Sequence, residues 1–148
     1  MPTSTSLRRV KVKRPPASLS VSTCTGSNLH KEPQLHRILK MRFSDGGFLG
    51  MIYDSCLTPV EPKRTRNHHK FAIVRIGTNP ISITVLSKRY TSVTVNCYTK
   101  QAYRNRGFAK LATKTALQDF KISKKITVAA HTEPMSNIVK KVGWKSIY

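Results

Sequence analysis

Residues 92–109 read SVTVNCYTKQAYRNRGFA, and this stretch decides the fold. Its first part alternates apolar and polar side chains, which predicts a strand over residues 91–99. A basic turn that contains Gly107 follows, and a helix then begins at Phe108. The helix carries an apolar stripe on one side, formed by Phe108, Leu111, Ala112, Thr115, Ala116 and Phe120.

The start of this helix has the chemistry of an anion-binding site. The first backbone N–H groups of a helix lack acceptors within the helix and lie at the positive end of its dipole. Gly107 lets an anion approach the backbone closely, and Arg104, Arg106 and Lys110 add positive charge. This arrangement predicts a cradle for a pyrophosphate. The alternative is an ordinary strand, turn and helix on a basic protein.

The chain downstream predicts a crossover and a second helix. Residues 126–130 are apolar and read as a buried strand, parallel to the strand at 91–99 because a helix lies between them. Thr132 or Glu133 is placed to cap a helix that begins with Pro134 and ends at Gly143. Residues 144–148 then extend again.

The chain upstream predicts an antiparallel meander. Residues 71–76, 81–86 and 91–99 are β-rich runs joined by short links. Before them we expect a helix at 33–42, a strand at 48–53 and a loop at 54–69 that ends in His68 and His69. The fold class is therefore α+β, with a mixed, mostly antiparallel sheet, a βαβ crossover and flanking helices. We interpret His68 and His69 as solvated loop residues and expect no metal site, because no partner ligands stand nearby.

The first 31 residues differ in composition from the rest. They hold ten Ser or Thr, the pair Pro15-Pro16 and no acid, and five cations lie within residues 8–14. We expect a flexible basic arm at 1–31 and one domain at 32–148. Three interpretations of the arm stay open: a tail that grips nucleic acid, an edge strand at 7–13, and an organelle-targeting segment.

Composition sets the broad class of the protein. The 148 residues include 27 Lys and Arg but only 6 Asp and Glu, a formal net charge of +21, which predicts contact with a polyanion. No apolar run approaches the ~20 residues of a membrane span, so we expect no membrane partner. Three widely spaced cysteines favour a reducing, cytoplasmic location.

The residues at 103–109 and 140–144 together resemble a known family. Arg104-Asn105-Arg106-Gly107-Phe108-Ala109 resembles the Arg/Gln-x-x-Gly-x-Gly/Ala loop of the GNAT superfamily, the acyl-CoA-dependent N-acetyltransferases, and Tyr103 resembles the entry to that loop. Lys140-Lys141-Val142-Gly143-Trp144 resembles the second signature, a short helix that ends in a glycine and an aromatic residue. The resemblance covers residues 70–148.

The resemblance implies specific roles. Acetyl-CoA would bind through its pyrophosphate to the loop, and the backbone of Thr99 would polarise the thioester carbonyl. The loop positions are Arg104, Asn105, Arg106, Gly107, Phe108, Ala109 and Lys110.

Three positions depart from the family pattern. Val139 stands where many members place a general-acid Tyr, and Thr132 stands where an Asn is frequent. Candidate replacements for the acid are Tyr98, His131, Ser136 and Tyr148. After Gly143 there is room for one short strand where members usually have two, so we expect a reduced substrate side or one completed by a partner subunit, as in a homodimer.

Two functions follow from these features. The first is an acetyl-CoA-dependent N-acetyltransferase that acts on an amine of an unknown substrate, such as an acidic protein or a nucleic acid held by the arm and the 63–70 loop. The alternative is a catalytically reduced GNAT-fold basic protein that binds nucleic acid or serves as a structural, virion-type interaction protein.

Overall fold

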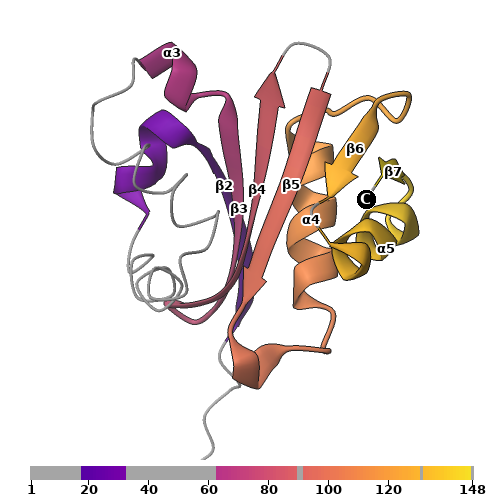
Figure 1. Ribbon diagram of the computed structural model, residues 1–148. Coiled ribbons are helices and arrows are strands. Elements are labelled where there is room, and N and C mark those ends of the chain that lie inside the picture. Colours follow the sequence, from indigo (N-terminus) through magenta and orange to yellow (C-terminus); the bar gives the residue numbers. More distant parts are fainter. Residues whose placement is uncertain (1–17, 33–62, 90–91, 131, 148) are drawn as a thin grey trace, which may run out of the picture.

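A computed structural model describes residues 18–32, 63–89, 92–130 and 132–147. They form one six-stranded sheet in the order β2-β3-β4-β5-β6-β7, with helices along it (Figure 1). The strands are β2 (Leu19–Thr25), β3 (His69–Ile76), β4 (Asn79–Arg89), β5 (Ser92–Thr99), β6 (Thr127–Ala130) and β7 (Lys145–Ile147). The helices are η1 (Gly26–Lys31), α3 (Lys63–Arg66), η2 (Gln101–Tyr103), α4 (Phe108–Asp119) and α5 (Glu133–Lys141).

The topology confirms the predicted mixed sheet. Strands β2 to β5 pair in antiparallel fashion, whereas β5–β6 and β6–β7 are parallel pairs. Helix α4 makes the crossover from β5 to β6, and α5 makes the crossover from β6 to β7. No helix among the described residues combines the length and apolar character that a bilayer crossing requires.

Two predicted segments need correction in the middle of the chain. Strand β4 continues to Arg89, through residues that the sequence indicated as a link, because Lys88 and Arg89 still pair with β5. The end of the predicted loop at 54–69 contains the short helix α3, and His69 lies in β3 with its Nδ1 2.8 Å from the Ser87 hydroxyl. The helix predicted at 33–42 and the strand predicted at 48–53 lie outside the described residues.

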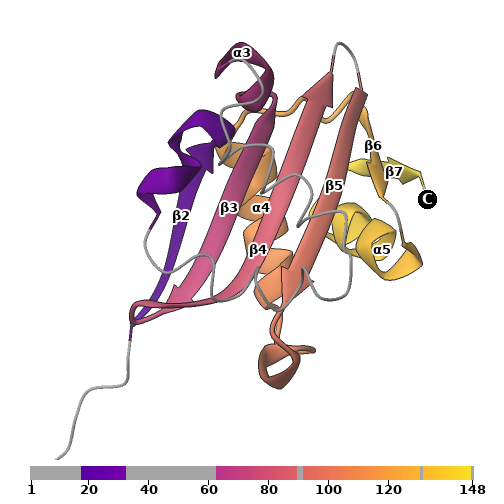
Figure 2. The ribbon, with the colours of Figure 1, turned by 60° about the vertical axis from the view of Figure 1, so that its left-hand side comes forward.

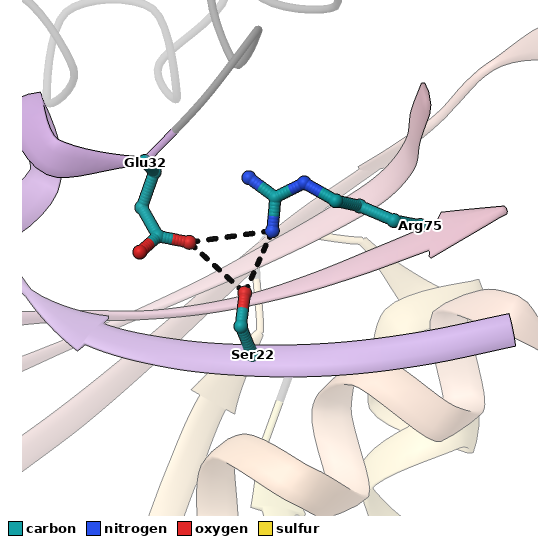
Figure 3. A network of polar contacts seen from close by, with 3 residues as sticks. All are labelled: Ser22, Glu32 and Arg75. Carbon is teal, nitrogen blue, oxygen red and sulfur yellow. Dashed lines mark hydrogen bonds and ion pairs between the residues drawn. The ribbon is translucent and has the colours of Figure 1, made fainter. Parts of the chain in front are cut away.

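The N-terminal boundary also differs from the prediction. Residues 19–31, assigned to the flexible arm, form β2 and η1, and β2 pairs along its whole length with β3. Figure 3 shows one reason: the Arg75 guanidinium donates to the Ser22 hydroxyl at 2.7 Å and forms an ion pair with Glu32 at 3.3 Å. Arg75 is buried, so this pairing ties the segment after η1 to the sheet. Residues 1–17, including the strand proposed at 7–13, are not described.

The core lies between the sheet and α4, which covers one face of the central strands (Figure 2). Helix α4 buries Ala112, Thr113, Ala116 and Leu117, so its inner face is turned slightly from the predicted stripe. The Thr113 hydroxyl lies 3.3 Å from the Thr84 hydroxyl, which satisfies both polar groups inside the core. The indole of Trp144 donates to the carbonyl oxygen of Ile122 at 3.0 Å and anchors β7 beside the end of α4.

Candidate active site

Strand β6 is hydrogen-bonded to the first half of β5 only, and the two strands diverge beyond it. Their ladder consists of the pairs Val93–Val128, Thr94–Ala129 and Val95–Ala130, and β5 then continues to Thr99 without β6 beside it. A cavity of about 860 Å³ opens at this divergence. Its wall comes from the second half of β5, from residues 103–105 and 107–110, and from the start and inner side of α5.

The backbone of β5 presents polar groups to this gap. The Lys100 N–H donates to the carbonyl oxygen of Ile81 on β4 at 2.9 Å. Backbone direction alternates along an antiparallel strand, so Tyr98 and Asn96 also direct their backbone groups toward β4. Cys97 and Thr99 therefore direct theirs to the opposite edge, into the gap beyond the last pair with β6.

The loop before α4 is built as the sequence predicts. Gly107 has φ +84° and precedes the first turn, a backbone conformation that favours glycine. The first backbone hydrogen bond of α4 is donated by the Leu111 N–H to the Gly107 carbonyl oxygen, at 3.0 Å. The N–H groups of Phe108, Ala109 and Lys110 precede it and have no acceptor within the helix.

Aromatic rings hold the side chains of the loop in place. The Arg104 guanidinium donates through Nε to the Thr99 carbonyl oxygen at 2.9 Å and lies 5.7 Å from the centre of the Tyr98 ring. Arg106 lies 5.9 Å from the Tyr103 ring, and that ring meets Phe108 edge to face. These contacts order the loop before any ligand arrives, which lowers the entropy lost on binding.

Charge at the cavity has a single sign. Arg104, Lys110 and Lys141 are among the described lining residues, and no Asp or Glu is. Exposed N–H groups at a helix start, together with three cations, suit a phosphorylated ligand. Arg106, also predicted as a binding residue, is not part of the lining and stacks on Tyr103 instead.

Cys97 lies at the bottom of the gap among hydroxyl groups. Its sulfur is 3.8 Å from the Ser82 hydroxyl, which in turn lies 2.8 Å from the Thr99 hydroxyl. Burial raises the pKa of the Cys97 thiol, and hydrogen bonds from Thr84, Ser82 and Thr99 offset only part of that shift. The thiol is therefore neutral at physiological pH and is a poor nucleophile.

The structure separates the candidates for a general acid. Tyr98 lines the cavity, as predicted from the sequence. Ser136 is buried on α5 and donates to the Ser146 hydroxyl at 2.9 Å, away from the cavity lining. His131 and Tyr148 lie outside the described residues. Val139 is fully buried and packs in the core.

Asn96 and Cys97 were missed as site residues by the sequence analysis. The Asn96 amide nitrogen is buried at the cavity and has no hydrogen-bond partner in the described part of the chain. The alternation of β5 places its side chain on the face opposite Cys97, with Tyr98. The only available signal was a polar residue inside a β-branched strand, which also fits a solvated face.

No protein-family model matches the chain, and neither does any curated protein sequence. Solved structures do match. An acetyltransferase from Clostridium acetobutylicum, solved with acetyl-CoA, has a TM-score of 0.57 at 15% identity over 88% of this chain and 92% of that one. The aminoglycoside N-acetyltransferase AAC(6')-Iy, solved with CoA, has a TM-score of 0.57 at 14% identity over 93% of both chains.

A third similar structure is an N-acetyltransferase from Staphylococcus aureus, with a TM-score of 0.55 at 14% identity over 84% of this chain and 81% of that one. These neighbours are similar to this chain in fold. They define a class of fold, that of the acyl-CoA-dependent acyltransferases. Within that class, the chain has the fold of the GCN5-related N-acetyltransferases, the GNAT superfamily.

Proposed function

We propose that the protein is an acetyl-CoA-dependent N-acetyltransferase. The observation that carries this proposal is the cavity at the divergence of β5 and β6, which joins an anion cradle at α4 to outward-facing backbone groups of β5. The N–H groups of residues 108–110 would hold the pyrophosphate, and Lys110 and Lys141 would balance its charge. The parted strands leave room for an extended pantetheine arm that bonds to β5 as a strand would.

Different groups of β5 have different roles in the proposed transfer reaction. Bound acetyl-CoA supplies the acetyl group as a thioester. A backbone N–H of Cys97 or Thr99 donates to the thioester oxygen, where negative charge develops during attack. Tyr98 lines the same cavity and is the residue we assign to donate a proton to the leaving sulfur.

We infer direct transfer to the amine rather than transfer through the protein. An acetyl-cysteine route would need the Cys97 thiolate, and burial keeps this thiol protonated. The nitrogen of the acceptor therefore attacks the carbonyl carbon, the carbon–sulfur bond breaks, and the proton lost by the nitrogen leaves through solvent or a basic group of the acceptor.

The acceptor is expected on the face of β5 that carries Asn96 and Tyr98. The buried amide nitrogen of Asn96 can donate to a carbonyl or hydroxyl oxygen of the acceptor, which would remove the penalty of leaving it unpaired. The net charge of +21 disfavours polycationic acceptors and favours an amine on an acidic protein or a nucleic acid.

Thermal unfolding with acetyl-CoA tests the proposal. A ligand at 100 times its Kd stabilises the native state by about 2.7 kcal/mol, which shifts the Tm of a protein of this size by several degrees. We expect this shift with acetyl-CoA and CoA but not with pantetheine, which lacks the pyrophosphate. Release of free CoA thiol should then depend on the amine in a panel of acidic peptides and small amines. An unchanged Tm at millimolar acetyl-CoA would refute the proposal.

A further inference from the structure

The end of the sheet opposite the cavity carries its own set of cations. Antiparallel and parallel pairing bring the start of β3, the end of β4, and the starts of β5, β6 and β7 to this end. Helix α3 and the connection from α4 to β6 lie there as well (Figure 1). We call the exposed cations of this end the basic edge. It consists of Lys63, Arg64, Lys88, Lys121, Lys125 and Lys145.

Two aromatic contacts join the elements of the basic edge. The ammonium of Lys70, on β3, lies 5.2 Å from the centre of the Phe120 ring. Phe120 directly precedes Lys121 in the sequence. The ammonium of Lys124 lies 5.0 Å from the centre of the Trp144 ring. Trp144 directly precedes Lys145 in the sequence. These contacts bring Lys70 of β3 close to the end of α4, and Lys124 of the connection after α4 close to the residue that precedes β7.

Among the described residues, no acidic side chain is paired with a cation of the basic edge. In the described part of the chain, the acids are Glu32, Asp119 and Glu133. Glu32 pairs with Arg75, Asp119 accepts a hydrogen bond from Thr23, and Glu133 opens α5. The cations of this end also affect one another. The pKa of Lys70 is lowered, first by burial and second by repulsion from the charge of Lys88.

Lys121 has a backbone conformation that is less favourable for lysine than for Gly or Asn. Lys121 has φ +54°, in the left-handed region where Gly or Asn is less strained. Its side chain is exposed. Packing does not explain a lysine there, whereas an external anionic partner does.

We propose that the basic edge binds the phosphate backbone of a nucleic-acid duplex, without regard to base sequence, at the end of the sheet opposite the cavity. Strands β3 to β7 span four intervals of ~4.8 Å, about 19 Å in all. Duplex phosphates follow one another every ~3.4 Å along each strand, so the row matches about six base pairs.

The chemistry of the edge favours a duplex over other polyanions. Single strands are held by bases stacked on exposed aromatic rings, whereas the described rings with a cation contact at this end, Phe120 and Trp144, face Lys70 and Lys124. Membrane surfaces are bound by cations together with inserted apolar side chains. The exposed large hydrophobic residues in the described ranges are Leu19 and Ile147, and β2 pairing places Leu19 beside Ile76, at the cavity end.

Fluorescence anisotropy with a labelled 20-base-pair duplex tests the proposal. The probes are a DNA duplex and an RNA duplex of the same sequence, because both offer the same phosphodiester backbone. The test variant carries Lys88→Gln, Lys121→Gln and Lys125→Gln. The control variant carries Arg106→Gln, Lys110→Gln and Lys114→Gln, which removes the same charge away from this edge.

The wild-type protein should bind at least one of the duplexes with an affinity that falls steeply between 50 and 200 mM salt. Each phosphate contact contributes about 0.9 to the slope of log Kd against log salt, so the test variant should lose about 2 to 3 from the slope. At 200 mM salt its affinity should fall about tenfold or more below that of the control variant. Its Tm shift with acetyl-CoA should stay at the wild-type value, which separates this proposal from the proposed function.

Three outcomes would overturn the proposal. Equal losses in the two variants would mean that net charge alone governs binding. No loss in either variant would place binding in another part of the chain. Stronger binding to polyglutamate or to phosphatidylserine vesicles than to either duplex would assign the edge to an acidic protein or to a membrane surface.

Discussion

The two ends of the sheet both carry cations, but they hold them differently. At the cavity end, Arg104 bonds to the Thr99 carbonyl and stacks on Tyr98, and Arg106 stacks on Tyr103. At the basic edge, Lys63, Lys88 and Lys125 have exposed side chains. Cations fixed around a concavity suit a small ligand of defined shape, whereas a row of exposed cations suits an extended polyanion.

The backbone explains why the cavity forms at the end of the sheet where α4 begins. Helix α4 starts at the cavity end and directs its unpaired N–H groups there, and β6 stops pairing with β5 after Val95. At the other end, β5 and β6 are still paired and both α4 and α5 finish, so neither of these two helices directs unpaired N–H groups there. Substitutions at each end should therefore affect different ligands, and the following predictions test that separation.

The largest effect is expected from Gly107→Glu. A side chain at this position meets no heavy atom within 4 Å, so it fits, but its carboxylate would lie at the helix start where the pyrophosphate is expected. Acetyl-CoA affinity should fall more than about 100-fold, measured by isothermal titration, because a like charge replaces open space at an anion site. Duplex binding at the basic edge should not change by more than about twofold.

Gly143→Glu is the matched control for this substitution. Gly143 also has a positive φ, +105°, but it ends α5, and its added Cβ would lie 3.5 Å from the Lys124 ammonium. Both variants should lose similar stability from backbone strain, about 1–2 kcal/mol. Similar loss of acetyl-CoA affinity in both would show that strain, not the anion cradle, explains the effect.

Tyr98→Phe should give the next largest effect. The ring that stacks on Arg104 is kept, and only the hydroxyl is lost. Loss of a general acid lowers the rate of transfer about 100-fold, while the Tm shift with acetyl-CoA should remain. Tyr103→Phe removes a hydroxyl from another lining residue and should leave the rate within about threefold. Equal effects in the two variants would remove Tyr98 from its assigned role.

Much of the cavity end was predictable from sequence because it is local. The alternation in 91–99, Gly107 and the stripe of α4 lie within thirty residues, and the structure confirms the strand and the helix. The Thr132 cap is also confirmed, with the Met135 N–H donating to its hydroxyl at 3.3 Å. Short-range patterns of this kind carry their own physical explanation.

Features that depend on distant partners were not predictable. Strand β2 has the Ser- and Thr-rich composition of a disordered arm, and its order depends on β3 and on the buried pair of Arg75 with Glu32, 43 residues apart. Ser136 was a candidate acid until its hydrogen bond to Ser146 on β7 became visible. The basic edge likewise joins α3, β4 and β7 only through sheet pairing, so the sequence shows its charge but not its position.

Asn96→Leu should stabilise the protein while it damages the cavity end. The buried Asn96 amide has no hydrogen-bond partner among the described residues, a defect that costs about 1–3 kcal/mol. We expect the free energy of unfolding in urea to rise by about 1 kcal/mol and transfer to the acceptor to fall about tenfold. Thr94→Val is the control on the same face of β5, because the Thr94 hydroxyl donates to the Ser87 carbonyl oxygen at 3.4 Å. A rise in stability with unchanged transfer would remove Asn96 from the acceptor site.

Lys88→Gln should give the smallest effect, and it belongs to the basic edge. The charge of Lys88 is the second cause, after burial, of the lowered pKa of Lys70, so its removal should relieve repulsion in the native state. A lysine whose pKa is lowered by folding destabilises the protein while it is protonated. The gain from Lys88→Gln should therefore be complete at pH 7, at most about 0.5 kcal/mol, and should shrink as the pH rises through the native pKa of Lys70. Urea unfolding at pH 7 and pH 10 measures this gain in the free energy of unfolding.

Lys114→Gln, on the exposed side of α4, is the control and should show no such pH dependence. A gain that persists at pH 10 would mean that repulsion with Lys70 is not its source, and the basic edge would then be less crowded with charge than its geometry indicates.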